Sequence, residues 1–161
     1  MLFRSVLTSD AARQKAVQGS YCVQRTESSG SGTGVCADSV VQHPKRLVVV
    51  RFGDAVTISM PDGKLVEDPE GCVPDCPPTV KVTPLGCPGP EVETFQLETD
   101  GATWSVFLPP GAYELQVYGR FEAPDGSSGD TSAVLGILVD PQRKRGIVKA
   151  ARDLFVCPPA T

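Results

Sequence analysis

The chain has 161 residues, of which 16 are glycine and 15 are proline, and its formal net charge is −4. Glycine and proline both interrupt helices, so their even spread excludes a protein of long helices and favours short strands joined by turns. The chain contains no run of about 18 apolar residues, which excludes a membrane-spanning helix. The length is sufficient for one domain with a core of ordinary size.

Runs rich in β-branched and aromatic residues recur at the spacing of a β-sandwich or β-barrel. In chain order we expect strands at residues 16–25, 46–51, 55–60, 79–83, 92–99, 103–108, 112–121 and 131–139. The clearest run is 112–121, where apolar and polar residues alternate as in a strand with one buried and one wet face. No helical stretch of useful length separates these runs, so we expect an all-β fold with antiparallel sheets.

Turn sequences lie between the predicted strands. Pro124-Asp125-Gly126 is one such turn, and Asp100-Gly101 predicts a tight hairpin between the strands at 92–99 and 103–108. Residues 28–34 are expected to form a flexible loop, because all of them are glycine, serine or threonine.

The chain is expected to divide into three parts. These are an N-terminal extension at 1–15, a β-sandwich domain at 16–140 with a Pro/Cys-rich insertion at 68–90, and a basic C-terminal tail at 141–161. Within the tail, apolar residues between 147 and 155 repeat at helical spacing, so residues 146–156 are predicted to form a short amphipathic helix. An added edge strand is the alternative.

Charge is distributed unevenly along the chain. Residues 81–140 carry two cations and nine acidic residues, whereas 141–152 carry cations alone. A basic tail can dock on the acidic body, on a partner or on anionic lipid, and a solvated or self-docked tail is the simpler interpretation. The candidate partner-binding residues are Arg143, Lys144, Arg145, Lys149 and Arg152.

The chain has six cysteines and no C-x-x-C sequence. An even number at irregular spacing is typical of three disulfide bonds formed in an oxidising compartment. The alternative is a zinc site made of Cys72, Cys76, Cys87 and Cys157, in which the first two have C-x3-C spacing but no second closely spaced pair follows. Residues 1–20 lack the apolar core of a signal peptide, so we expect an export signal to have been removed, with a cytosolic chain as the alternative.

The sequence contains no asparagine. A glycosylation acceptor of the form Asn-x-Ser/Thr is therefore excluded. Loss of asparagine, together with few methionines and abundant proline in loops, is typical of heat-adapted proteins and predicts a thermophilic source.

Catalytic and metal-binding patterns are weak throughout. His43 is the only histidine, and no Gly-x-Ser-x-Gly sequence occurs, so we expect a loop histidine without a catalytic role. The glycine-rich residues 30–34 lack the spacing of a phosphate-binding loop. Acidic residues at 62–70 and 125–130 are expected to form turns, with calcium binding as the alternative. We therefore expect no enzyme, no cofactor and no metal, and we expect no nucleic-acid binding because the tail has Phe155 as its only aromatic residue.

Two cysteine-containing motifs indicate a resemblance. Gly19-Ser20-Tyr21-Cys22, followed by Gly34-Val35-Cys36-Ala37-Asp38, resembles a group of bacterial extracytoplasmic and lipoprotein-type β domains of unknown function. The resemblance spans residues 16–139 and implies an immunoglobulin-like sandwich outside the cytoplasm, with Cys22 bridged to Cys36; it implies no activity. For the cysteines outside the shared pattern we expect the pairs Cys76–Cys87 and Cys72–Cys157.

The expected function is that of a non-enzymatic extracytoplasmic structural or interaction module, a subunit of a bacterial surface or extracellular assembly. Its N-terminal 15 residues and its basic tail are expected to reach neighbours by strand addition or charge pairing. The alternative is a monomeric secreted domain that binds or senses a solute through loops at one end. We expect protein partners or self-association, and peripheral membrane contact by the basic tail is a further candidate.

Overall fold

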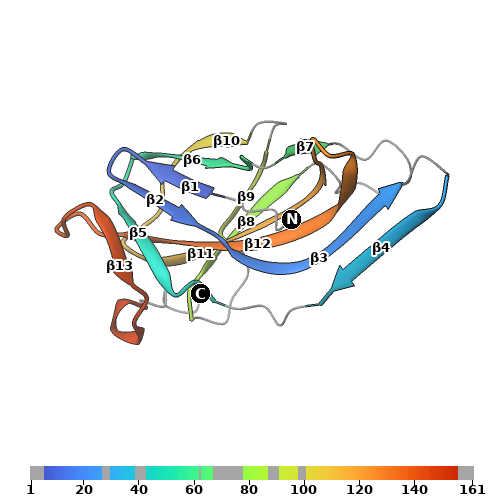
Figure 1. The fold of residues 1–161 in the computed structure, drawn as a ribbon. Coiled ribbons are helices and arrows are strands. Elements are labelled where there is room, and N and C mark those ends of the chain that lie inside the picture. The colour runs from blue at the N-terminus through green and yellow to red at the C-terminus, as the bar shows by residue number, and fades with distance from the viewer. Residues whose placement is uncertain are drawn as a thin grey trace.

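A computed structural model of the chain describes residues 6–26, 30–38, 43–61, 63–66, 78–86, 91–97 and 101–155. Over these residues the fold is all-β and sandwich-like, with two mainly antiparallel sheets, which confirms the predicted class (Figure 1). The smaller sheet has the strand order β10 (Ala102–Ser105), β6 (Ala55–Ser59), β1 (Val6–Ser9) and β2 (Ala12–Lys15).

The larger sheet is built around two long strands. Its order is β13 (Gly146–Lys149), β5 (Arg46–Val50), β12 (Ser127–Val139), β11 (Gly111–Glu122), β8 (Thr79–Pro84) and β9 (Glu93–Gln96). Three further strands extend it: β3 (Val17–Thr26) pairs with β12, β4 (Gly32–Ala37) pairs with β3, and β7 (Lys64–Val66) pairs with β11. All described pairings are antiparallel except that between β5 and β12.

The core lies between the two sheets and follows from the predicted alternation in β11. Leu115, Val117 and Phe121 point inward and are buried against apolar side chains of the smaller sheet, such as Leu7 and Ile58. Each large side chain buried in this way stabilises the fold by roughly 1.5–3 kcal/mol. The alternation in β11 therefore decides which face of the larger sheet packs against the smaller sheet.

Side chains close both open sides of the sandwich. On one side the Trp104 ring stacks on Phe95 with centroids 5.1 Å apart, and its Nε1 donates to Glu93 Oε1 at 2.9 Å, which joins β10 to β9. On the other side, Gln14 Nε2 of β2 donates to the carbonyl oxygen of Arg46 at 2.6 Å. The two sheets are thus held together at their edges as well as through the core.

The C-terminal part of the chain covers one half of the outer face of the larger sheet. Val148, Ala150, Leu154 and Phe155 pack on a second apolar cluster, whose buried members are Leu47, Val49, Leu85, Ala112 and Leu138. The predicted helix at 146–156 is wrong: residues 146–149 form the edge strand β13, and Arg152–Leu154 form only a 3-10 turn, η1. The edge-strand alternative is correct, because β5 offers an unpaired ladder to which β13 hydrogen-bonds.

The described part of the expected N-terminal extension, residues 6–15, belongs to the sandwich. Residues 6–15 form β1 and β2, and β1 pairs with β6 inside the smaller sheet. Val6 and Leu7 are buried, so this segment supplies core rather than reaching outward. The expected flexible loop at 28–34 is also shorter than predicted, since residues 32–34 lie in β4.

The predicted hairpin at Asp100-Gly101 is wrong. β9 pairs with β8 in the larger sheet and β10 pairs with β6 in the smaller one, so the chain crosses between the sheets at this point. Gly101 has φ +110°, and a Cβ there would lie 2.0 Å from the carbonyl oxygen of Ile58. The glycine is required by close approach to β6 rather than by a two-residue turn.

The start of β11 is anchored by a tyrosine. The Tyr113 hydroxyl donates to the carbonyl oxygen of Pro109 at 2.9 Å, four residues upstream, an arrangement that fixes corners in many β-sandwiches. Burial raises the pKa of this phenol. An immunoglobulin-like topology in particular stays a prediction. No helix in the described part of the chain has the length and apolarity needed to cross a bilayer.

Candidate functional site

The disulfide bond between Cys22 and Cys36 is present, as the resemblance implied. The two cysteines lie directly opposite each other on β3 and β4. The bond therefore links neighbouring strands of one hairpin, and not the two sheets. Cys72, Cys76, Cys87 and Cys157 lie outside the described residues, so their pairings and the zinc alternative stay predictions.

The hairpin of β3 and β4 forms an arm, which we define as residues 17–26 and 30–38. β3 pairs with β12 from Val17 opposite Val134 to Arg25 opposite Ser127, and β4 pairs with β3 alone among the described strands. Figure 1 shows the arm projecting past the end of the smaller sheet. β4 is almost wholly exposed, and Val35 has 63% of its surface accessible.

The free edge of β4 lacks the usual protection of edge strands. Soluble proteins place charged residues, proline or bulges on edges, because unpaired backbone groups recruit other strands. β4 reads Gly-Thr-Gly-Val-Cys-Ala, without charge or proline. By contrast, β2, β7, β9 and β13 each carry a charged residue, and uncharged β10 is joined to β9 through Trp104. Among the described edges, β4 is the one open to strand addition.

The disulfide also shows which backbone groups of β4 face outward. The Cα atoms of Cys22 and Cys36 are 4.0 Å apart, the close spacing of a non-hydrogen-bonded pair in an antiparallel ladder. The N–H and C=O of Cys36 therefore point away from β3, and those of Gly34 and Gly32, at intervals of two residues, do the same. These three residues present the donors and acceptors that a partner strand would use.

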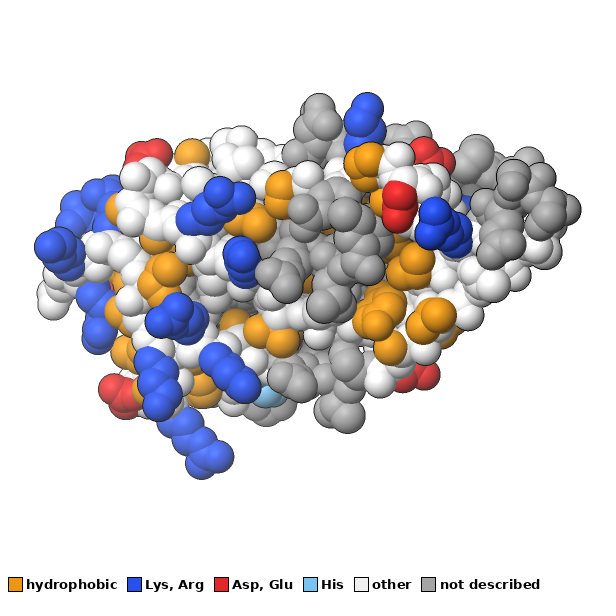
Figure 2. Space-filling view, in the orientation of Figure 1, with side chains coloured by type: hydrophobic (Ala, Val, Ile, Leu, Met, Phe, Trp, Pro, Cys, Tyr) orange, Lys and Arg blue, Asp and Glu red, His pale blue; other side chains and the backbone are white. Residues whose placement is uncertain are grey.

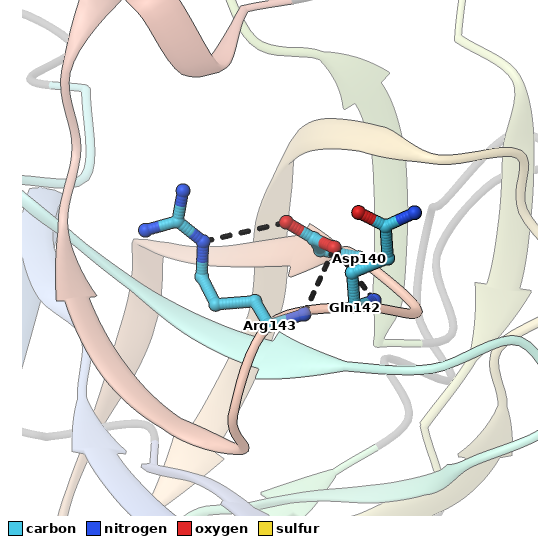
Figure 3. A network of polar contacts seen from close by, with 3 residues as sticks. All are labelled: Asp140, Gln142 and Arg143. Carbon is cyan, nitrogen blue, oxygen red and sulfur yellow. Dashed lines mark hydrogen bonds and ion pairs between the residues drawn. The ribbon is translucent and has the colours of Figure 1, made fainter.

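The five candidate basic residues differ in their contacts with the rest of the domain. Arg143 Nε lies 3.3 Å from Asp140 Oδ2, and the backbone N–H groups of Gln142 and Arg143 donate to Asp140 Oδ1 at 2.9 and 3.1 Å (Figure 3). The hydrogen bond from the Gln142 backbone is the main reason why the pKa of Asp140 is lowered. This network shapes the turn after β12.

Arg145 makes a two-pronged contact with a different turn. Its Nη2 and Nε donate to Asp54 Oδ1 and Oδ2 at 2.6 and 3.0 Å, and the Arg51 N–H donates to Asp54 Oδ2 at 2.9 Å. The hydrogen bond from Arg145 is the largest cause of the lowered pKa of Asp54. Lys144, Lys149 and Arg152 are exposed and form no ion pair with a described residue.

A groove lies on the other half of the outer face of the larger sheet. Its volume is about 600 Å³, which is within the range of small-molecule sites. Strand register places Lys81, Gln116 and Val134 in one row across it, with Thr79, Tyr118 and Ser132 in the next row. Lys81 Nζ lies 3.6 Å from Glu91 Oε2 at the border of the groove. Alternation within β11 predicted that Gln116 and Tyr118 face outward, but not which strands flank them.

His43 contacts the same face beside the groove. Its Nδ1 lies 2.7 Å from Glu114 Oε2, and Gln116 Nε2 donates to Glu114 Oε1 at 2.7 Å. Glu114 is buried, although the alternation predicted a wet position, and its two carboxylate oxygens are contacted by His43 and Gln116. The described residues contain no cluster of three or more potential metal ligands. The predicted turn at 125–130 is shorter than expected, because β12 begins at Ser127; Asp125 Oδ1 accepts from the Ser127 N–H at 3.1 Å.

No protein-family model, curated protein or solved structure matches the chain. Membership of the bacterial extracytoplasmic β domains therefore stays a prediction. The geometry distinguishes two candidate binding features, the free edge of β4 and the groove.

Proposed function

We propose that the protein is a non-enzymatic extracytoplasmic interaction module and a subunit of a bacterial surface assembly, which binds a partner by strand addition at β4. The observation that carries this proposal is an exposed edge strand without charge or proline, stapled by a disulfide. The disulfide supports an extracytoplasmic location, since such bonds persist in oxidising compartments.

The staple prepares the edge for binding. Because Cys22 and Cys36 hold β4 in register with β3, less conformational entropy is lost when a partner strand adds to the edge. The partner strand that fits is β4 of a second copy of the chain. An uncharged strand paired antiparallel with itself brings no like charges together, and a two-fold axis gives both copies the same contacts.

Proline substitution at Gly34 tests this arrangement. Gly34→Pro removes an outward-facing N–H while leaving the ladder to β3 intact, because proline is tolerated where an edge N–H faces solvent. Each dimer loses two hydrogen bonds, so self-association is expected to weaken at least about tenfold. Sedimentation equilibrium of the full chain over a concentration series measures the effect.

Gly34→Ala is the matched control. A Cβ at Gly34 would lie 3.7 Å from Gln24 Cγ and 3.8 Å from the carbonyl oxygen of Val23, which are ordinary contacts. This variant keeps the N–H and is expected to associate like the original chain. A chain that stays monomeric at all concentrations, or a proline variant that associates as strongly as the alanine variant, contradicts strand addition between copies.

The groove supports a second candidate function, a monomeric domain that binds a small solute. Its polar rows from three neighbouring strands could orient a ligand, and the exposed Tyr118 ring could cover one face of it. Titration with a panel of monosaccharides and amino acids, followed by amide chemical shifts, is the test. Shifts confined to the groove rows at millimolar concentration support this function, and their absence across the panel counts against it.

A further inference from the structure

The end of the sandwich opposite the arm is formed by four turns, at residues 9–12, 51–54, 106–110 and 140–146. Figure 1 shows these turns, which follow β1, β5, β10 and β12, together at the left of the molecule, while the arm projects to the right. We call this region the loop end. The β4 proposal uses none of its residues.

Two phenylalanines at the loop end contact each other in an exposed position. Phe52 is 68% exposed and Phe107 is 64% exposed, yet their ring centroids are only 5.4 Å apart, in an edge-to-face arrangement. Single exposed apolar side chains are common on protein surfaces, whereas adjoining ones form an apolar patch, and such patches mark candidate binding sites. Because the residues are 55 positions apart in sequence, only the fold brings them together.

The turns that present these rings are held in place by hydrogen bonds. The Asp54 N–H donates to the Arg51 carbonyl oxygen at 3.0 Å, and Gly53 has φ +83°. Residues 51–54 therefore form a type II turn, with Phe52 at position i+1. The Gly53 N–H donates to Val106 oxygen at 2.7 Å, and the Val106 N–H donates to Asp54 oxygen at 2.9 Å. The rings therefore project from two turns that are joined to each other.

Cations lie on the turn that carries Phe52 and on the neighbouring turn at 140–146. Asp54 draws the Arg145 guanidinium to the base of the turn that carries Phe52, and Arg51 begins that turn. Arg51 and Lys144 are exposed and form no ion pair with any residue that the structure describes. Figure 2 shows Lys and Arg side chains gathered over this end of the visible face, with few acidic ones.

We propose that the loop end docks on an anionic phospholipid surface. The two phenyl rings would enter the boundary between headgroups and acyl chains, and the cations would lie against lipid phosphates. A lipid surface fits better than a folded partner because the rings stand at the tip of turns, where a soft interface can surround them. Docking in this way would point the arm away from the bilayer and leave β4 accessible.

Vesicle binding by the full chain is the test. Vesicles of phosphatidylcholine with about a quarter phosphatidylglycerol are compared with vesicles of phosphatidylcholine alone, by co-sedimentation at low and high salt. We expect binding to the anionic vesicles alone, and weaker binding at high salt, because salt screens the cations. Absence of binding to anionic vesicles at low salt, or equal binding to both compositions, overturns the proposal.

Two double variants show whether the aromatic pair is responsible. Phe52→Ser with Phe107→Ser is expected to reduce partitioning to anionic vesicles at least about tenfold, because both rings lose their apolar contact with lipid. Phe52→Trp with Phe107→Trp should keep binding, since tryptophan favours the membrane interface. Circular dichroism checks that each variant folds. Retained binding by a folded serine variant overturns the proposal, as does equal loss in both variants.

Discussion

The two ends of this sandwich are organised differently. At the arm, two strands extend beyond the smaller sheet, and a disulfide between Cys22 and Cys36 joins them. At the loop end, backbone hydrogen bonds and the Asp54–Arg145 contact join three of the turns, at 51–54, 106–110 and 140–146, and Asp140 orders the last of them. The arm exposes backbone groups along a strand, whereas the loop end exposes two aromatic rings and several cations.

This difference shows how one small domain can present two kinds of surface. A strand edge binds through evenly spaced hydrogen bonds and selects another strand, while rings and cations on turns bind through apolar contact and charge. We expect the arm to depend on its disulfide, because β4 pairs with one strand among those described and is almost wholly exposed. The loop end needs no staple, because its turns adjoin buried residues such as Val50 and Val106.

Removal of the disulfide is expected to have the largest effect, because it lowers the stability of the arm and not that of the loop end. Replacing Cys22 and Cys36 by serine is expected to cost the arm about 3 kcal/mol of local stability, the loop-closure value for a bond across 14 residues. Amide hydrogen exchange should become faster in β4 and stay slow at Leu115 and Val117. Reduction of the unmodified protein should give the same result, and unchanged protection of β4 would show that the staple is not needed.

Tyr113→Phe tests how firmly the loop at 106–110 is held. Loss of the hydroxyl leaves the Pro109 carbonyl oxygen without its donor, which should lower the free energy of unfolding by about 1 kcal/mol. The pKa of the Tyr113 phenol is raised in the folded protein. The contribution of the phenol to the free energy of unfolding should therefore be complete below pH about 10 and be lost as the pH rises through the folded-state pKa. Urea unfolding at pH 7 and under alkaline conditions measures both effects. Equal stability of the two chains at pH 7 would contradict this role.

Asp54→Asn is expected to have the smallest effect. The ion pair with Arg145 is partly exposed, so its loss should cost no more than about 1 kcal/mol. The pKa of Asp54 is lowered on folding, so its contribution is complete above the unfolded value of about 4 and is lost as the pH falls through the folded value. The stability difference between variant and original should therefore shrink from pH 6 towards pH 2. A stability difference that grows as the pH falls would contradict the lowered pKa of Asp54.

Sequence reasoning succeeded where side-chain alternation was strong. The buried face of β11 was predicted residue by residue, because Tyr113, Leu115, Val117 and Phe121 recur at a period of two. It failed where strands are short or polar, as in β1, β2 and β4, whose local propensity is overridden by pairing with neighbours. The helical spacing of Leu154 and Phe155 was misleading, since both contact one apolar cluster from a turn that follows a strand.

The candidate sites were also predicted only in part from the sequence. Exposed Phe52 and Phe107 could not have been paired by inspection of the chain, because the contact depends on where two distant turns meet. The free edge of β4 was not predicted, because the first half of the strand, residues 32–34, lies in a segment that composition assigned to a loop. The basic residues were identified correctly as a charged run, but Asp54, 91 residues from Arg145, determines how one of them is held.

By itself, the amino-acid sequence determined the all-β class and the buried face of β11, because glycine, proline and alternating apolar residues act locally. Only the tertiary structure decided that β4 is an open edge and that two phenylalanines meet at the opposite end. Strand order and contacts between turns depend on segments far apart in the chain, and local sequence carries no record of which of them become neighbours.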